Sequence, residues 1–339
     1  MKHLAFALIA LLPVPALAQD EAALLAQAVT EHILPSYENL AEAAQVLETA
    51  ALTDCTFDGP DLRAAYHDAF DAWIAVSHLR FGPSEDQNRA FAMAFWPDKK
   101  GFTAKALTAL ISDQDPIVDT PEQYSEVSIA GRGFFALDML MFDPRYLDVD
   151  ADYTCRLLRA ITTDISIVSD GILGDWQSEY ATYMLTAGSD TNPVYFTPAE
   201  GVQELFKAVL TGLEFTQGQR LSRPMGTFDR PRATRAEAWR SGRSSRNVVI
   251  ALNAAQELSE ILTSYVSGGV AQDANARLAY AVRQAERLDD PVFAGVADPS
   301  DRFKVEAVQT SIIAAYDYLV EELGPALGVN PGFNALDGD

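Results

Sequence analysis

The residues best suited to chemistry are arginines in the second half of the chain. They lie close together, at Arg220, Arg223, Arg230, Arg232, Arg235, Arg240, Arg243 and Arg246. Guanidinium groups bind carboxylates through paired hydrogen bonds. The cluster therefore either binds an anionic ligand or neutralises acids from a neighbouring part of the fold, and both roles can coexist.

One stretch of this cluster adds hydroxyl and amide groups to the guanidinium groups. Thr234 and Glu237 have the spacing of a capping box, which predicts a helix running from there toward Tyr265. Three arginines then recur every third residue along that helix. We therefore predict ligand contacts from Trp239, Arg240, Ser241, Arg243, Ser244, Arg246 and Asn247.

Asp138 is the most unusual acid, because residues 129–142 around it are apolar on every side. Such a helix is buried all round, and a buried carboxylate needs a cation, hydrogen-bond donors or a metal. Three roles stay open for Asp138: an ion pair with an arginine, contact with a ligand, or a metal ligand. Gly131 and Gly133 would let another backbone or a ligand approach closely.

These two features predict a location for the site. The buried carboxylate of Asp138 and the arginines of segment 240–246 would neutralise each other's charge if they lay on facing helices where two bundles meet. Arg132, six positions before Asp138, projects from another side of its helix. It stays among the predicted ligand-binding residues.

Histidine offers little for metal binding after residue 18. His32, His67 and His78 remain, and none belongs to a His-Glu-x-x-His motif. His67, Asp71 and His78 fall within roughly 40° on a helix. Because the apolar stripe of that helix lies well away from them, we expect them on its solvent-exposed face.

The first residues and the charge indicate the compartment and exclude some partners. Residues 1–18 resemble a secretory signal peptide, with a short apolar run before Ala16-Leu17-Ala18. No later segment is apolar enough to span a membrane. The net charge of −23 argues against nucleic acid and anionic membrane surfaces. We expect an exported, periplasmic protein.

Cys55 and Cys155 are the only cysteines. An even pair in an exported protein predicts a disulfide, although two unrelated buried thiols would give the same count.

Helical periodicity covers almost the whole chain, and strand patterns are nearly absent. We predict an all-α protein of two packed helical bundles, with about four main helices each. Residues 19–150 would form the N-terminal bundle and residues 151–339 the C-terminal bundle, divided at a polar stretch with Pro144. Pro35 would kink the first helix.

Four stretches in this order resemble the imelysin-like family, in particular a branch of predicted periplasmic lipoproteins. They are Ile33-Leu34-Pro35-Ser36-Tyr37, then Leu79–Pro83 with Phe95-Trp96-Pro97-Asp98, then Gly133–Asp138, and lastly Trp239–Asn247 with Gly332-Phe333-Asn334. Unlike a lipoprotein, this chain has Gln19, not Cys, directly after Ala18.

The resemblance implies two helical bundles with a site at their junction, and it adds Trp96 and Asp98 to the predicted ligand-binding residues. The family was named for a peptidase whose motif is Gly-x-His-x-x-Glu. Here Gly133 matches the glycine, Phe135 stands at the histidine, and Asp138 replaces the glutamate. A water-activating metal centre would thus lack a ligand.

Many relatives are associated with iron acquisition, so we expect a periplasmic binding or accessory protein of iron uptake that is not catalytic. Its partner would be a small anionic molecule, an iron chelate or an envelope iron-uptake protein. Iron or another divalent metal is the cofactor to test, with Asp138 as a metal ligand. The alternatives are a metallopeptidase of the imelysin type and a structural partner in an envelope complex.

Overall fold

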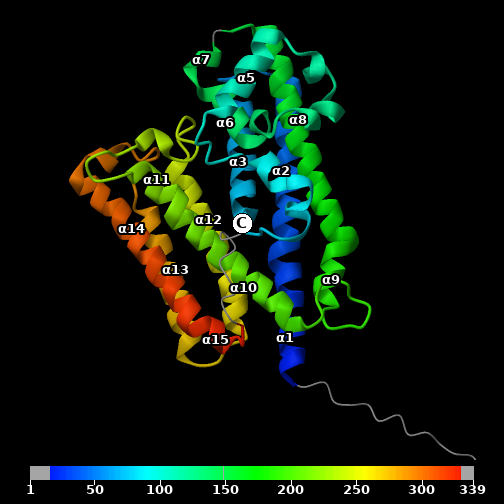
Figure 1. Ribbon diagram of the computed structural model, residues 1–339, viewed down its shortest axis with the longest axis vertical. Helices are drawn as coiled ribbons and strands as arrows, with labels where there is room; N and C mark the ends of the chain where they lie inside the picture. Colours follow the sequence, from blue (N-terminus) through cyan, green and yellow to red (C-terminus); the bar gives the residue numbers. More distant parts are fainter. Residues whose placement is uncertain (1–15, 148, 330–339) are drawn as a thin grey trace, which may run out of the picture.

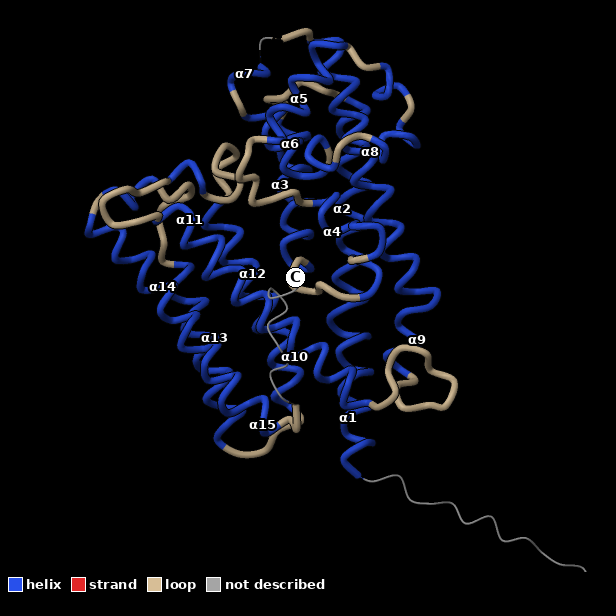
Figure 2. The backbone as a smooth tube through the Cα atoms, viewed as in Figure 1, coloured by secondary structure: helices blue, strands red, loops and turns tan. Residues whose placement is uncertain are grey.

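The computed structural model describes residues 16–147 and 149–329. The predicted signal peptide up to residue 15 and the Gly332-Phe333-Asn334 motif lie outside the described residues. The described chain is helical, and its residues form no strand, only one isolated bridge between Thr227 and Arg230 (Figure 2). The predicted all-α class is therefore confirmed. No described helix is both long and apolar enough to cross a membrane.

The first group of helices forms around the long N-terminal segment. It contains α1 (Ala16–Gln27), α2 (Leu34–Thr53), α3 (Pro60–Val76), α5 (Phe102–Asp113), α6 (Gly133–Phe142) and α8 (Ala151–Asp175). Helix α2 packs against both α3 and α8, and α6 packs against α5 and α8 (Figure 1). The predicted division at residue 150 does not follow this packing, because α8 belongs with the helices that precede it.

The second group consists of α10 (Pro198–Phe215), α12 (Ser244–Ser264), α13 (Gly269–Glu286) and α14 (Pro299–Tyr318). Helix α12 packs against α10 and α13, and α13 against α14. The two groups meet where α12 contacts α3 and where α10 contacts α1. Short α-helices complete the chain: α4 (Arg89–Met93), α7 (Pro144–Leu147), α9 (Ala181–Leu185), α11 (Ser222–Met225) and α15 (Gly324–Ala326).

Several long helices contain a wider, π-helical turn. These turns are η1 (Ala28–Ile33), η7 (Trp176–Tyr180), η8 (Thr216–Leu221) and η11 (Leu319–Leu323). The turn η1 ends two residues before Pro35, which has no N–H for a helical hydrogen bond. The expected irregularity in the first helix is thus a change of pitch, through which the chain continues as α2.

Short stretches of 3-10 helix lie in the connections. They are η2 (Gly82–Ser84), η3 (Asp86–Asn88), η4 (Pro116–Asp119), η5 (Pro121–Glu126), η6 (Ile129–Gly131), η9 (Ala233–Arg235) and η10 (Ala294–Ala297).

The predicted disulfide is present. Cys55 follows the end of α2, Cys155 is the fifth residue of α8, and their Cα atoms are 5.3 Å apart. Arg159 reinforces this end of the bundle, since its Nε donates to the carbonyl oxygen of Ala51 and its Nη2 to that of Leu52. These bonds satisfy carbonyl groups at the C-terminus of α2 that lack partners within the helix.

Candidate functional site

Helix α6 carries Asp138 into the interior. Gly133 begins this helix with a φ of +69°, and a Cβ there would lie 2.1 Å from the carbonyl oxygen of Ala92. Only glycine tolerates both the backbone conformation and the close approach, as its sequence context predicted. The start of α6 is thereby fixed against the end of α4, which sets the depth of Asp138.

Asp138 lies at the junction of the two helix groups and is only 2% exposed. Its Oδ1 accepts hydrogen bonds from Tyr66 Oη at 2.9 Å and from Ser241 Oγ at 2.5 Å. Burial raises the pKa of Asp138, against these hydrogen bonds and the charges of Arg240 and Arg243, which lower it. Of the three roles left open for Asp138, the direct ion pair with an arginine is not formed, because two hydroxyl groups are the partners of the carboxylate.

The segment opposite Asp138 is a turn rather than a helix. Helix α12 begins at Ser244, with Arg243 as its N-cap residue, and Thr234 belongs to the separate turn η9. The predicted helix start at Thr234 is therefore wrong. Glu237, the expected partner in the capping box, instead accepts a hydrogen bond from Arg220 Nε at 2.8 Å, in an ion pair buried on both sides.

Two of the three evenly spaced arginines bind an acid on α3. Arg243, only 1% exposed, donates to Asp71 and also contacts His67 Nδ1 at 2.9 Å. Arg246 donates to both carboxylate oxygens of Asp71. Arg240 instead donates to Asp143 Oδ2 at 2.6 Å. The cluster thus neutralises acids of the first helix group. These acids are Asp71 and Asp143 rather than Asp138.

The expectation that His67, Asp71 and His78 face solvent is wrong. Helix α12 covers the polar side of α3, so α3 is enclosed on two sides. His78 is 4% exposed, and its Nε2 lies 3.1 Å from Nε2 of His32. Burial, followed by the charges of Arg243 and Arg246, lowers the pKa of His67 to about 4. Burial also lowers the pKa of His78 well below its usual value. The imidazoles of His67 and His78 therefore stay neutral near pH 7.

Three other predicted ligand-binding residues have partners within the protein. Arg132 donates from Nε and Nη2 to Asp164, at 2.9 and 2.7 Å, within the first helix group. Ser244 Oγ donates to the carbonyl oxygen of Glu237, and Asn247 Nδ2 donates to its side chain. These three side chains hold the framework around the junction together.

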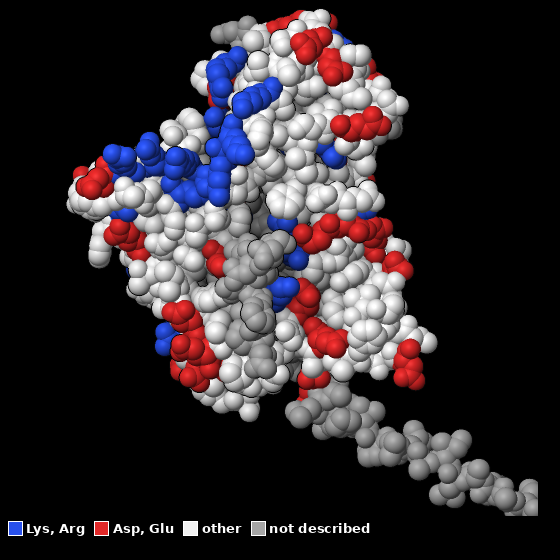
Figure 3. Space-filling view, viewed as in Figure 1, with Lys and Arg blue, Asp and Glu red and all other residues white. Residues whose placement is uncertain are grey.

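A pocket of about 340 Å³, called the junction pocket below, brings other predicted residues together. Its lining includes Trp96, Asp98, Asp138, Trp239 and Arg240, together with Arg145, Arg223 and Arg235. Sequence reasoning had placed Arg223 and Arg235 in the cluster without assigning them a contact, and Arg145 had given no signal. Figure 3 shows basic side chains gathered in one band on this face.

Arg223 is the most exceptional of these arginines. Its guanidinium lies over the Trp96 ring, 5.6 Å from the ring centroid, and its Nε is buried without a hydrogen-bond partner. Burial and the like charge of Arg235 lower the pKa of Arg223. An anion in the pocket would relieve both effects, since it supplies an acceptor and an opposite charge.

Two further aspartates, Asp98 and Asp143, are stabilised in different ways. Burial alone would raise the pKa of Asp98, yet hydrogen bonds from the backbone N–H groups of Thr103, Phe102 and Lys100 keep that pKa below its usual value. Asp143 accepts hydrogen bonds from Arg145 and Arg240, which hold its pKa well below the usual range. Asp143 thus neutralises part of the arginine charge from outside the pocket lining.

The residues of the junction do not fit a protein-held metal ion. Among residues 16–147 and 149–329, no group of three or more His, Cys, Asp and Glu side chains could hold one. Phe135 packs its ring against Phe70 and Trp96, with centroids 5.4 and 6.0 Å apart. Two carboxylates line the junction pocket: Asp138 is bound by hydroxyl groups, and Asp98 is bound by backbone N–H groups. An iron-containing ligand would have to bring its own chelator.

Comparison with known proteins gives the family and the fold. The model of the imelysin family (Peptidase_M75) matches residues 33–317. An imelysin-like protein from Psychrobacter arcticum 273-4 superposes with a TM-score of 0.80 at 17% identity, covering 95% of this chain and 100% of that one. A protein from Parabacteroides distasonis ATCC 8503, described as an iron-regulated protein A precursor, gives 0.60 at 13% identity, covering 92% and 96%. No curated protein matches in sequence.

Proposed function

Because this chain belongs to the imelysin family, we propose that it is a periplasmic binding or accessory protein of iron uptake that holds a small anion in the junction pocket. The observation that carries the proposal is Arg223, with a buried Nε that lacks an acceptor and with Arg235 as a like-charged neighbour. A chain of net charge −23 has acids in excess, yet it leaves this guanidinium without an acceptor at Nε.

The aromatic rings suggest the shape of the ligand. Trp96 lies beneath Arg223, and Trp239 lies beneath Arg240 at 4.7 Å from the ring centroid. Stacking on an aromatic ring holds a guanidinium in one orientation, which favours a carboxylate that binds with both oxygens. A compact polycarboxylate, alone or as the chelator of a ferric ion, suits this arrangement.

The first experiment measures binding of citrate and of ferric citrate by calorimetry, at low and high salt. We expect binding that weakens with salt and falls at least tenfold in Arg223→Gln, by the loss of one charge-assisted contact. Arg230→Gln is the matched control, since Arg230 is exposed and lies outside the pocket lining. Equal effects of the two substitutions, or no binding of either compound at millimolar concentration, would refute the ligand site.

The role in iron uptake and the lack of catalysis need separate tests. Expression that does not rise under iron limitation would count against the first. For the second, pure protein supplied with zinc or ferrous ion should not cleave unfolded casein, because Phe135 stands at the histidine position of the peptidase motif. Cleavage that a chelator inhibits and Asp138→Ala abolishes would instead support the metallopeptidase.

Export is tested by fractionation and by the mass of the purified protein. The proposal expects the chain in the periplasmic fraction with Gln19 as its first residue. A cytoplasmic protein that keeps residues 1–18 would exclude a role in the envelope.

A further inference from the structure

A second cavity shares Trp96 and Phe135 with the lining of the junction pocket. It has a volume of about 430 Å³ and is called the aromatic pocket below. Helix α3, the segment around α4, and helices α10 and α12 contribute to its lining. Its size lies within the range of small-molecule sites, which are mostly apolar with a few polar groups.

The walls of the aromatic pocket are rings. Trp73, Phe91, Trp96, Phe135 and Phe215 all line it. Trp96 stacks on Phe135 at an interplanar angle of 15°, and it meets Phe215 edge to face at 71° with centroids 5.8 Å apart. Phe91 is 46% exposed, a large ring left in contact with solvent. Flat faces and edges of this kind pack best against another planar ring.

The floor of the pocket offers hydrogen-bond donors without net charge. Arg220 and Glu237 form an ion pair there, with side chains 3% and 4% exposed. Arg220 also donates to Thr216 Oγ1 at 3.1 Å and weakly to Ser77 Oγ at 3.4 Å. A guanidinium has five N–H bonds, so Arg220 keeps donors for a ring substituent. The charge itself is already neutralised by Glu237.

The charge available to a ligand comes from Lys207. Three cations, Arg80, Lys207 and Arg220, and two carboxylates, Glu85 and Glu237, line the pocket. Glu85 accepts from Arg80 Nε at 2.5 Å, and Glu237 binds Arg220. The ammonium of Lys207 is 4.0 Å from its neighbour Glu204, and its side chain is 47% exposed. Glu204, the ion-pair partner of Lys207, does not line the pocket, so the lining itself carries one positive charge.

We propose that the aromatic pocket binds a small planar aromatic anion, with the ring among Trp96, Phe135 and Phe215 and the negative group beside Lys207. An aromatic cation would meet the remaining positive charge. A purely apolar ring would gain nothing from Lys207. The site differs from the junction pocket in its cations and stands whether or not citrate binds there.

The test compares two dyes that share a naphthyl and a phenyl ring. One is 8-anilinonaphthalene-1-sulfonate, an anion, and the other is N-phenyl-1-naphthylamine, which is neutral. Their dissociation constants are measured by dye fluorescence on the full mature chain. Energy transfer from tryptophan to the bound dye should be strong, because Trp73 and Trp96 line the pocket.

Two substitutions probe the pocket. Thr211→Phe places a ring in the space, and we expect it to weaken both dyes at least tenfold. Lys207→Gln removes the charge from a side chain that is half exposed and so is tolerated by the fold. It should weaken binding of the anionic dye about fivefold, typical of one exposed charge contact. The dissociation constant of the neutral dye should change less than twofold.

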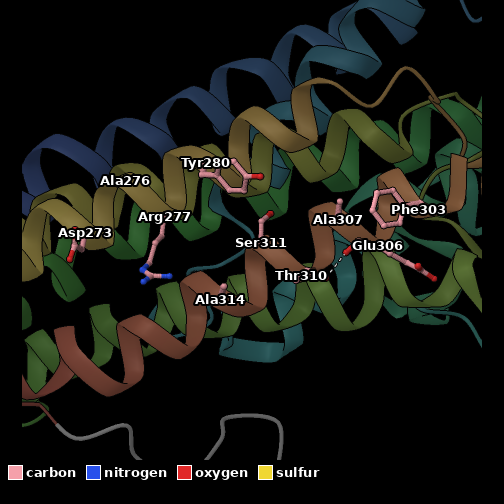
Figure 4. Close-up of a pocket in the computed structure, with 10 residues that line it drawn as sticks. All are labelled: Asp273, Ala276, Arg277, Tyr280, Phe303, Glu306, Ala307, Thr310, Ser311 and Ala314. Atoms are coloured by element: carbon pink, nitrogen blue, oxygen red, sulfur yellow. Dashed lines mark hydrogen bonds between the residues drawn. The ribbon is translucent and has the colours of Figure 1, made fainter. Parts of the chain in front are cut away.

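The controls use a groove between α13 and α14, lined among others by Tyr280, Phe303 and Thr310 (Figure 4). Thr310→Phe and Lys304→Gln repeat the same chemical changes away from the aromatic pocket and should alter neither dye. Loss of dye binding in Thr310→Phe but not in Thr211→Phe would place the dye in that groove and overturn the proposal. So would an equal effect of Lys207→Gln on both dyes.

Discussion

Ser241 donates a hydrogen bond to Asp138 Oδ1 at 2.5 Å, and this bond joins two segments that are 103 residues apart. Tyr66 Oη donates to the same oxygen and lies 3.3 Å from Ser241 Oγ. Burial and the charge of Asp138 raise the pKa of Tyr66 well above its usual value. Tyr66 is therefore a neutral donor, and the three side chains form a closed triangle at the junction of the helix groups.

Removal of the carboxylate should destabilise the protein, because two buried hydroxyl groups would lose their acceptor. We expect Asp138→Ala to cost about 2–4 kcal/mol in the free energy of unfolding, and Asp138→Asn about 1 kcal/mol, since the amide keeps an acceptor oxygen. Urea unfolding measures both. Asp58→Ala, at an exposed aspartate, is the control and should cost less than about 0.5 kcal/mol. An alanine variant as stable as the asparagine variant would contradict this account.

The burial of Asp138 was predictable, while its partners were not. A segment without a polar face must be buried, so residues 129–142 fixed the environment of the carboxylate without any knowledge of the fold. The partners come from positions 72 and 103 residues away. No local sequence pattern relates positions so far apart. Whether an arginine or a serine becomes the partner of Asp138 depends on the shape of the turn around Ser241, which tertiary contacts set.

Two mistaken predictions share one physical cause. Thr234 and Glu237 have the spacing of a capping box, yet Glu237 forms a buried ion pair with Arg220 instead. His67 and Asp71 lie away from the apolar stripe of α3, yet Arg243 covers them. In both cases a charged contact between distant segments decided the outcome, and for the capping box the local preference that it outweighed is about 1 kcal/mol. The arginine cluster and the acidic residues elsewhere in the sequence indicated that ion pairs between distant segments would form. They did not indicate which residues these ion pairs would join.

Arg243 and Arg246 share the carboxylate of Asp71 and should differ greatly in their contribution to stability. Arg243 is 1% exposed and also lies over the Phe70 ring, whereas Arg246 is 53% exposed. We expect Arg243→Met to cost about 2–3 kcal/mol, because Asp71 and the carbonyl oxygen of His67 both lose a buried donor, although Arg246 still binds Asp71. Arg246→Met should cost less than about 1 kcal/mol, as for surface pairs. If urea unfolding gave the same loss of stability for both variants, burial would not explain a difference between Arg243 and Arg246.

The disulfide should contribute strongly to stability without determining the fold. Cys55 and Cys155 are 100 residues apart, and closing such a loop stabilises by about 4–5 kcal/mol in the chain-entropy model. The double substitution to serine should lower the free energy of unfolding by up to this amount and leave the circular dichroism spectrum unchanged. Arg159 still caps α2 in that variant. Two alkylatable thiols in the unreduced, denatured wild type would show that the bridge does not form in the cell.

Acid should destabilise the protein through the buried histidine pair, His32 and His78. Burial lowers the pKa of His32 to about 4, and burial with the charge of His32 lowers the pKa of His78 well below its usual value. In the unfolded chain a histidine titrates near 6.5, so below that pH the unfolded state binds the proton and the folded state does not. The free energy of unfolding is therefore not reduced by these histidines above about pH 6.5, and it falls as the pH drops toward 4.

The size of this effect for His32 alone is about 2 kcal/mol at pH 5, from the shift in its pKa. The variant His32→Gln cannot titrate and can still donate to His78 Nε2. Urea unfolding at pH 7.5 and pH 5.0 should give a loss of stability about 2 kcal/mol smaller in the variant than in the wild type. Glu257 Oε2, 3.8 Å from His32 Nδ1, is mostly exposed and offers little charge compensation. The same pH dependence in both proteins would mean that His32 is protonated in the folded state and that the pair opens before the protein unfolds.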